Sequence, residues 1–300
     1  MGATAFDPDL SGVARWLPRA PFSKRTLPIM QSLSRLVGKR PPHHQAVERV
    51  GPTSVRLHGL ISGAAPRPAM LWIHGGGFVI GSAAQDDALC AHVADELGVT
   101  VAAVDYRLAP AHRFPVPLED CYRALVWLAD QPTVDEARIA IGGASAGGGL
   151  AASLAMLARD RGEVQPAFQL LSYPMLDDRT ATRVDIDERD FRLWNNKSNH
   201  LAWEAYTGAA PGSASIPTLA APGRSSDLAG LPPAWIGVGA LDLFLEEDQS
   251  YARRLADAGV PCELYVVDGA FHGFDSVRPK AGVTRSFRAS QVAALARALT

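Results

Sequence analysis

Short, nearly continuous apolar runs alternate with amphipathic stretches from about residue 45 to the end of the chain. Such apolar runs are typical of strands buried on both faces, and an apolar period of about 3.6 residues indicates a helix. The predicted strands are residues 54–61, 69–77, 99–106, 137–145, 168–174, 234–242 and 262–269. The predicted helices are residues 86–98, 118–130, 146–162, 248–259 and 285–299. This alternation predicts an α/β fold whose parallel sheet is covered by helices on both faces.

Two segments break the alternation. Residues 1 to about 44 are rich in proline and arginine and carry isolated aromatic residues such as Trp16 and Phe22. Residues from about 178 to 230 form a long connection between two predicted strands. Because long connections over a sheet commonly form lids, we favour a functional role for this insertion over a peripheral decoration.

One stretch of 20 residues, Ile139 to Ala158, contains no charged side chain and is long enough to cross a bilayer. Its first half holds five glycines, which disfavour a helix interior, so we expect no membrane span. A phosphate loop would need lysine where Gly148 stands, and a dinucleotide fingerprint would need glycine where Ser145 stands. The stretch therefore predicts a buried strand, a tight turn and a helix.

Composition narrows the classes of function. The 300 residues are 47% hydrophobic and 20% charged, which is enough apolar material for a sizeable core. The formal net charge is −2, so no basic surface indicates nucleic acid or anionic lipid as a partner. A small-molecule substrate fits this balance better.

The cysteines and the N-terminal sequence bear on the compartment. Cys90, Cys121 and Cys262 are odd in number and widely spaced, which matches neither a disulfide framework nor a zinc site. We interpret them as core thiols in a reducing, cytoplasmic environment. The first residues lack an apolar segment of the secretory type, so we expect no signal peptide.

The turn at Gly143–Gly147 has the order G-x-S-x-G and joins a predicted strand to a predicted helix. A serine at such a turn takes strained backbone angles and projects its hydroxyl from the sheet. Small neighbours are needed because the turn brings strand and helix close together. Ser145 is therefore the candidate nucleophile.

A serine hydroxyl needs a base to remove its proton and a third group to orient that base. Among eight histidines, His272 lies in a glycine-flanked loop directly after the last predicted strand. Open α/β sheets place their sites at this end of the strands. The other histidines are His43, His44, His58, His74, His92, His112 and His200. We predict His272 as the base.

The acid should also follow a strand and precede His272. Asp242 meets both conditions, although an aspartate here could simply cap the next helix. Glu246 is the alternative acid. The order Ser145, Asp242, His272 is that of α/β-hydrolases.

A glycine loop, His74 to Phe78, follows an earlier predicted strand. Acyl transfer develops an oxyanion that needs backbone N–H donors, and glycine lets the main chain approach without a Cβ. His74 could be a metal ligand, but it has no partner at ligand spacing, so we favour a bracing role for it.

With these residues assembled, the chain resembles the hormone-sensitive-lipase-like (family IV) carboxylesterases of the α/β-hydrolase superfamily. The motifs HGGGF, DYRLAP, GASAGG, an aspartate after a strand and FHGF carry the resemblance from about residue 45 onward. It implies a mostly parallel eight-stranded sheet and a single domain over residues 1–300. It also implies a helical cap formed by residues 1 to about 44 and about 178 to 230.

The resemblance assigns roles within these motifs. It implies that Ser145, Asp242 and His272 form the catalytic triad. It implies an oxyanion hole built from amides of Gly75, Gly76, Gly77 and Ala146. In the DYRLAP motif it implies structural roles for Asp105 and Arg107, and charges near buried strand ends should be paired.

Two residues depart from the family pattern. Ala144 stands where the family usually has aspartate or threonine before the nucleophile, so a hydrogen bond near the turn is lost or supplied elsewhere. Ala111 replaces a common glutamate after DYRLAP. Neither change touches the triad.

The sequence thus predicts a serine carboxylic ester hydrolase for short- to medium-chain acyl esters that needs no metal or organic cofactor. Cleavage of amides, carbamates or lactones uses the same groups and stays open as an alternative, as does a non-catalytic ligand receptor on the same fold. A homodimer also stays open. Candidate pocket residues, besides Trp16 and Phe22, are Phe78, Phe191, Trp194, Trp203 and Tyr206.

Overall fold

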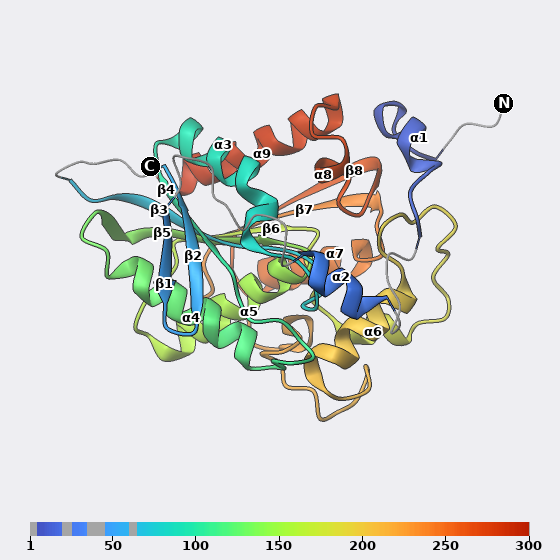
Figure 1. The fold of residues 1–300 in the computed structure, drawn as a ribbon, viewed down its shortest axis with the longest axis horizontal. Helices are drawn as coiled ribbons and strands as arrows, with labels where there is room; N and C mark the ends of the chain where they lie inside the picture. The colour runs from blue at the N-terminus through green and yellow to red at the C-terminus, as the bar shows by residue number, and fades with distance from the viewer. Residues whose placement is uncertain (1–4, 20–25, 35–45, 60–64, 300) are drawn as a thin grey trace.

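An eight-stranded sheet forms the centre of the molecule (Figure 1). The structure is a computed structural model that describes residues 5–19, 26–34, 46–59 and 65–299. The strand order is β1-β2-β4-β3-β5-β6-β7-β8. β2 pairs antiparallel with β1 and with β4, and every other neighbouring pair is parallel. The prediction of a mostly parallel eight-stranded sheet is confirmed.

The strands are β1 Ala46–Val50, β2 Thr53–His58, β3 Arg67–Ile73, β4 Thr100–Val104, β5 Val134–Ala144, β6 Phe168–Ser172, β7 Ala234–Leu241 and β8 Cys262–Phe271. The α-helices are α1 Pro8–Ala14, α2 Leu27–Ser34, α3 Asp87–Leu97, α4 Val116–Ala129, α5 Ala146–Arg161, α6 Asn196–Thr207, α7 Leu245–Asp257, α8 Phe274–Val277 and α9 Gly282–Leu299. Short 3-10 helices are η1 Ala83–Asp86, η2 Asp178–Thr182 and η3 Pro222–Arg224.

The sequence pattern missed β1. Its residues, AVERV, include three exposed positions and make no apolar run, so neither periodicity nor burial marks them as a strand. The strand forms because a tight turn at Gly51, with a φ of 59°, folds it back onto β2. A left-handed φ of this kind favours glycine.

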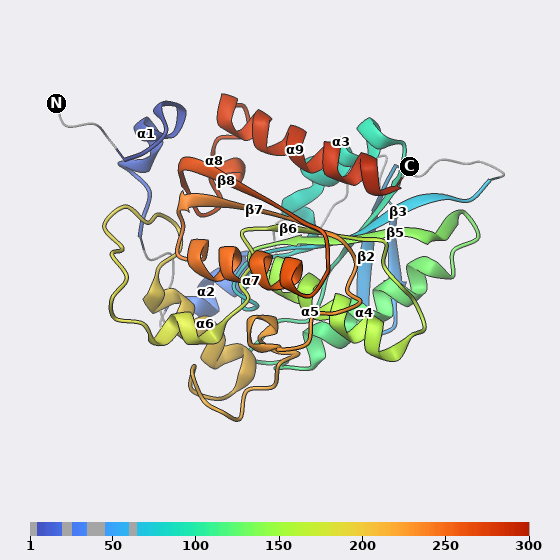
Figure 2. The same cartoon turned by 180° about the vertical axis from the view of Figure 1, so that it is seen from behind.

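Helices cover the sheet in two layers. α3 and α9 lie on one face, and α4, α5 and α7 lie on the other (Figures 1 and 2). Each layer packs its own apolar core against the sheet. Because β3 and β5 to β8 run parallel, their carboxyl ends meet at one edge, where the candidate residues follow the strands.

The charge-free stretch divides as predicted into the end of β5, a turn at Ser145, and α5. Every residue from Ala146 to Ala158 is buried, so the missing charge reflects a covered helix. Gly149 illustrates the close packing, because a Cβ there would lie 2.1 Å from the Met175 carbonyl oxygen. None of the helices in the described ranges combines the length and apolar character that a bilayer crossing requires.

The DYRLAP motif is anchored by an acid that the sequence analysis did not single out. The Arg107 guanidinium donates from Nε and Nη2 to the two oxygens of Asp120, each at 2.8 Å. Asp120 is fully buried and also accepts the Arg107 backbone N–H at 3.1 Å. Asp105, expected to be paired as a charge, is instead exposed and accepts the Ala83 backbone N–H. An exposed carboxylate keeps its contact with solvent and needs no paired cation.

Replacing Asp120 with alanine should lower the free energy of unfolding by about 2 kcal/mol, because the Arg107 guanidinium and the Arg107 backbone N–H both lose the carboxylate that accepts their hydrogen bonds. Urea denaturation of the purified protein measures this change. Asp135→Ala serves as the control, since Asp135 forms an ion pair at the surface with Arg138 and its loss should matter much less. Equal destabilisation by both variants would contradict the assignment.

Candidate active site

Ser145 sits at a sharp turn between β5 and α5. Its φ is 57° and its ψ is −121°, an unusual conformation for a residue with a side chain. Glycine is needed on both sides: a Cβ on Gly143 would lie 2.4 Å from the Gly147 carbonyl carbon, and one on Gly147 would lie 2.0 Å from the Ile73 oxygen. The turn therefore lifts the Ser145 hydroxyl to the edge of the sheet.

Three residues far apart in the sequence meet at this edge. Nε2 of His272, directly after β8, lies 2.9 Å from Oγ of Ser145. Nδ1 of His272 lies 2.8 Å from Oδ2 of Asp242, directly after β7. The other carboxylate oxygen of Asp242 accepts the Phe244 backbone N–H at 3.0 Å. All three side chains are buried, so each polar group relies on the others for hydrogen bonds.

The alternative residues do not reach this point. Glu246 is exposed and pairs with Arg183. His58 lies near Asp87, His92 near Glu96, and His200 is exposed on α6. His43 and His44 lie outside the described residues. Among the residues that the structure describes, the geometry thus favours the three that the sequence order suggested.

The glycine loop lies beside the turn. A Cβ on Gly75 would lie 2.9 Å from the Ala144 carbonyl oxygen and 3.3 Å from the Ser145 Cβ. Gly76 has a φ of 121° and Gly77 a φ of 59°, values that an L side chain rarely adopts. The glycine loop therefore passes next to Ser145. Ala146, the residue directly after Ser145, begins α5.

His74 is held inside this loop. Its Nδ1 is hydrogen-bonded to the Gly75 carbonyl oxygen at 2.8 Å, and its ring stacks on Tyr106 at 4.3 Å. The Tyr106 hydroxyl donates to the His74 carbonyl oxygen. Burial lowers the pKa of His74 below its usual value, which favours the neutral ring. These contacts brace the loop, as the sequence suggested.

The predicted pocket aromatics fall into different environments. Phe78, Trp203 and Tyr206 are buried and pack against one another, with Phe78 and Tyr206 stacked at 4.0 Å. Trp203 and Tyr206 thus pack against Phe78, the last residue of the glycine loop. Trp16 is 87% exposed because α1 turns Leu10 and Ala14 inward and ends before it, so its assignment to a pocket was wrong.

Two further aromatic residues that the candidate list lacks surround His272. Tyr173 and Phe244 present edges to its ring at centroid distances of 4.9 and 5.3 Å. Tyr173 directly follows β6 at the same edge of the sheet as Ser145. This position after a predicted strand is the sequence signal that could have marked Tyr173 as a site residue. Of the remaining predicted residues, Phe191 is half-buried, Trp194 lies near His272, and Phe22 is outside the described residues.

Comparison with known proteins identifies the family. A family model for the α/β hydrolase fold matches residues 70–276, more than half of the chain. The chain belongs to the α/β-hydrolase family. Esterase LipI of Mycobacterium tuberculosis is 38% identical over 214 residues, which cover 70% of this chain and 66% of LipI. Ethyl acetate hydrolase of Pseudomonas putida is 34% identical over 210 residues, which cover 69% of this chain and 65% of that protein.

Solved structures agree over the full length of this α/β-hydrolase. A bacterial heroin esterase superposes with a TM-score of 0.88 at 36% identity, covering 99% of this chain and 98% of that one. The matches to LipI and ethyl acetate hydrolase span just under two thirds of those proteins. The resemblance to hormone-sensitive-lipase-like esterases is confirmed.

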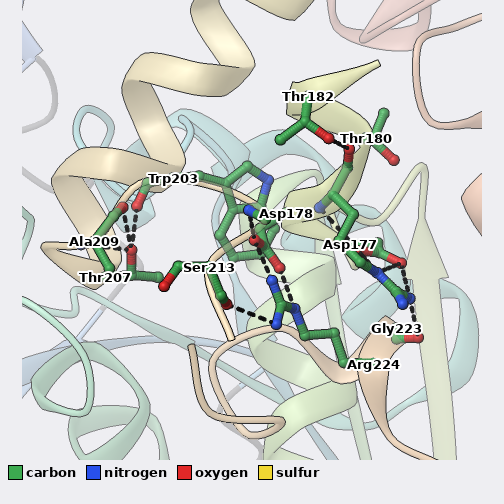
Figure 3. Close-up of polar contacts among 12 residues, drawn as sticks. Asp177, Asp178, Thr180, Thr182, Trp203, Thr207, Ala209, Ser213, Gly223 and Arg224 are labelled. Atoms are coloured by element: carbon green, nitrogen blue, oxygen red, sulfur yellow. Dashed lines mark hydrogen bonds and ion pairs between the residues drawn. The ribbon is translucent and has the colours of Figure 1, made fainter. Parts of the chain in front are cut away.

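The insertion of this α/β-hydrolase is held together by a buried ion pair. Asp178 in η2 is fully buried, and Arg224 in η3 donates to both of its oxygens (Figure 3). The Gly212 backbone N–H donates to the same carboxylate at 2.6 Å, and Arg224 also donates to the Ser213 carbonyl oxygen at 2.9 Å. These bonds connect η2, the loop after α6, and η3.

A second acid fastens the start of the insertion to α7. Glu247 accepts the backbone N–H groups of Leu176 at 2.7 Å and Asp177 at 3.2 Å, and it also accepts the Thr180 hydroxyl. Burial raises the pKa of the Glu247 carboxyl to about 8, since the cost of removing the charge from water outweighs these hydrogen bonds. The contact links the helix that follows Asp242 to the insertion.

This raised pKa predicts a pH-dependent stability. An unfolded glutamate has a pKa of about 4.3, so the native state binds more protons up to a pH of about 8. The contribution of Glu247 to stability should therefore be largest at low pH and decline as pH rises through this window. The unfolding free energy of the wild type, minus that of Glu247→Gln, should fall over the same range in urea titrations.

The neighbouring substitution Glu246→Gln, which removes an exposed carboxylate from the same helix, is the control for the loss of a charge on α7. A difference between the wild type and Glu247→Gln that is flat or rises with pH would refute the assignment.

Proposed function

We propose that this α/β-hydrolase is a serine carboxylic ester hydrolase that acts on short- to medium-chain acyl esters through an acyl-enzyme intermediate. The observation that carries the proposal is the hydrogen-bonded series from Ser145 Oγ to His272 Nε2 and from His272 Nδ1 to Asp242 Oδ2. This series gives a serine a base and gives the base an orienting carboxylate.

In the proposed first half-reaction, Ser145 Oγ attacks the ester carbonyl carbon while His272 Nε2 takes the hydroxyl proton. The carbonyl oxygen becomes negative and is stabilised by backbone N–H groups of the glycine loop and Ala146. Asp242 stabilises the imidazolium. His272 then protonates the leaving alcohol as its bond to carbon breaks, which leaves an acyl-serine.

In the second half-reaction, water attacks the acyl-serine and gives a proton to His272. The bond between the acyl carbon and Ser145 Oγ breaks, and His272 returns the proton to that oxygen. The products are a carboxylic acid and the free enzyme. The proton exchanged between Ser145 and His272 passes between atoms 2.9 Å apart, which supports the assignment.

The acyl part of the substrate is proposed to be short or medium in length. Ethyl acetate hydrolase, 34% identical to this chain, is named for an acetyl ester. The predicted pocket residues Phe78, Trp203 and Tyr206 are fully occupied in packing, which supports a shallow rather than a deep apolar pocket.

We also propose that the N-terminal segment and the insertion act together as a cap. The Leu193 backbone N–H donates to the Pro18 carbonyl oxygen at 2.9 Å, and Arg192 Nε donates to the Ala14 carbonyl oxygen at 2.6 Å. These bonds join two segments that are distant in the sequence, which supports a shared role above the site.

A cytoplasmic location is proposed for this protein. Cys90 and Cys121 are buried free thiols, which agrees with a reducing compartment. Cys262, at the start of β8, is half-buried and packs against the core from its edge.

The nucleophile assignment predicts the effect of one substitution. Ser145→Ala should lower the turnover of p-nitrophenyl butyrate at least about a thousandfold, because it removes the hydroxyl that is hydrogen-bonded to His272. A fluorophosphonate probe should label the wild type at Ser145, as mapped by mass spectrometry. Ser153→Ala, a change at a buried serine within α5, is the control and should keep its activity. Equal turnover by Ser145→Ala and the wild type would refute the proposal.

We propose a homodimer that pairs through β8. This strand is at the edge of the sheet and carries Leu264 and Val266, each 37% exposed. An edge strand with exposed apolar side chains is suited to pairing with a second copy.

Sedimentation velocity should show a dimer for the wild type and a monomer for Val266→Lys, because a charge at the paired edge opposes association. Val184→Lys, the same change at a fully exposed valine of the insertion, should remain dimeric. A monomeric wild type would overturn the dimer proposal.

A further inference from the structure

Trp194 touches both parts of the proposed catalytic machinery. It lies just before α6, and its indole is buried at 4% exposure. The indole centroid is 6.0 Å from that of the His272 ring. A Cβ on Gly77 would lie 2.5 Å from the Trp194 Cη2 atom, so the tip of the indole rests against the glycine loop. One side chain of the insertion therefore borders the base and the oxyanion loop together.

The other two rings around His272 belong to the body of the protein. The Tyr173 hydroxyl donates to the buried Asp275 at 2.7 Å, and the Tyr173 ring stacks on Phe287. Phe244 is fully buried at the start of α7. Among the described aromatic neighbours of His272, Trp194 alone comes from the insertion. It is thus the ring placed to border the substrate.

The chemistry of the proposed reaction decides which part of the ester meets this ring. His272 Nε2 must give its proton to the oxygen of the leaving alcohol, so the alcohol carbons lie beside His272. The acyl carbonyl oxygen points instead to the backbone amides. A ring against His272 therefore faces the alcohol part.

We propose that Trp194 sets the size and shape of the alcohol part of the ester. Esters of small primary alcohols or flat phenols fit beside the indole, and esters of bulky secondary or branched alcohols are excluded. The proposal rests on the esterase function proposed above and names the substrate class of the same site.

The indole is held in place by its own segment. Leu193 has a φ of 65°, and its backbone N–H is bound to Pro18. The Arg192 guanidinium lies 4.8 Å above the Phe6 ring and donates to the Ala14 carbonyl oxygen. Arg192 and Leu193, the two residues that precede Trp194, are thus both bound to the N-terminal segment. A fixed ring imposes a sharper size limit than a mobile one, because it does not yield to a larger substrate.

Two ester series measured in a pH-stat separate the alcohol side from the acyl side. The first varies the alcohol at constant acetyl: ethyl, phenyl and cyclohexyl acetate. The second varies the acyl group at constant ethanol: ethyl acetate, butyrate and octanoate. In Trp194→Ala, the kcat/KM for cyclohexyl acetate relative to ethyl acetate should rise at least about tenfold. The ratio for ethyl octanoate to ethyl acetate should stay within about twofold.

Two variants make the test specific. Trp194→Phe keeps an aromatic ring of smaller size and should give a smaller shift in the same direction, so the proposal stays testable if Trp194→Ala folds poorly. Trp16→Ala makes the same change at an exposed tryptophan and should leave both ratios unchanged.

A shift in the acyl ratio instead of the alcohol ratio would overturn the proposal, as would no shift in either. Fluorophosphonate labelling separates this failure from that of the esterase proposal. An enzyme that labels at Ser145 and cleaves esters with unchanged ratios refutes only the role of Trp194. A wild type that neither labels nor cleaves esters refutes the underlying function.

Discussion

The close crossing of β3, β5 and the start of α5 is the constraint on which the site depends. A Cβ on Gly147 would lie only 2.0 Å from the carbonyl oxygen of Ile73, so no side chain fits there. The chain makes this turn only with glycines on either side and with Ser145 at a positive φ. That strain directs the hydroxyl out of the sheet, where residues from β7 and β8 reach it. Without the crossing, Ser145 would be an ordinary buried serine.

The polar groups at this edge are stable because they bind one another. Asp242 is buried, yet it accepts hydrogen bonds from His272 and from the Phe244 backbone. Buried polar groups without partners would each cost about 1–3 kcal/mol. Aromatic rings around His272 leave its imidazole little freedom to turn away. The same contacts that make burial tolerable also hold the geometry needed for proton transfer.

The insertion is connected to the α/β body through Glu247 and to the N-terminal segment through Arg192 and Leu193. Glu247 binds the backbone where the insertion begins, and Asp178 with Arg224 closes the insertion on itself. The bonds of Arg192 and Leu193 to residues near the N-terminus hold the stretch that carries Trp194. The insertion thereby presents one ring at the proposed site from a position 49 residues after Ser145 in the sequence.

Much of the fold and the order of the candidate triad could be predicted from the sequence alone. Apolar runs, helix periods and the glycines around Ser145 are local signals, since each depends on residues that are neighbours in the chain. Three features were decided by the tertiary structure alone. Arg107 binds Asp120, and Trp16 is exposed. The polar residues of β1 form a strand only because β2 lies beside them. The position of Trp194 against His272 also emerged only there. Such pairings depend on how the sheet orders distant segments, and no local pattern records that order.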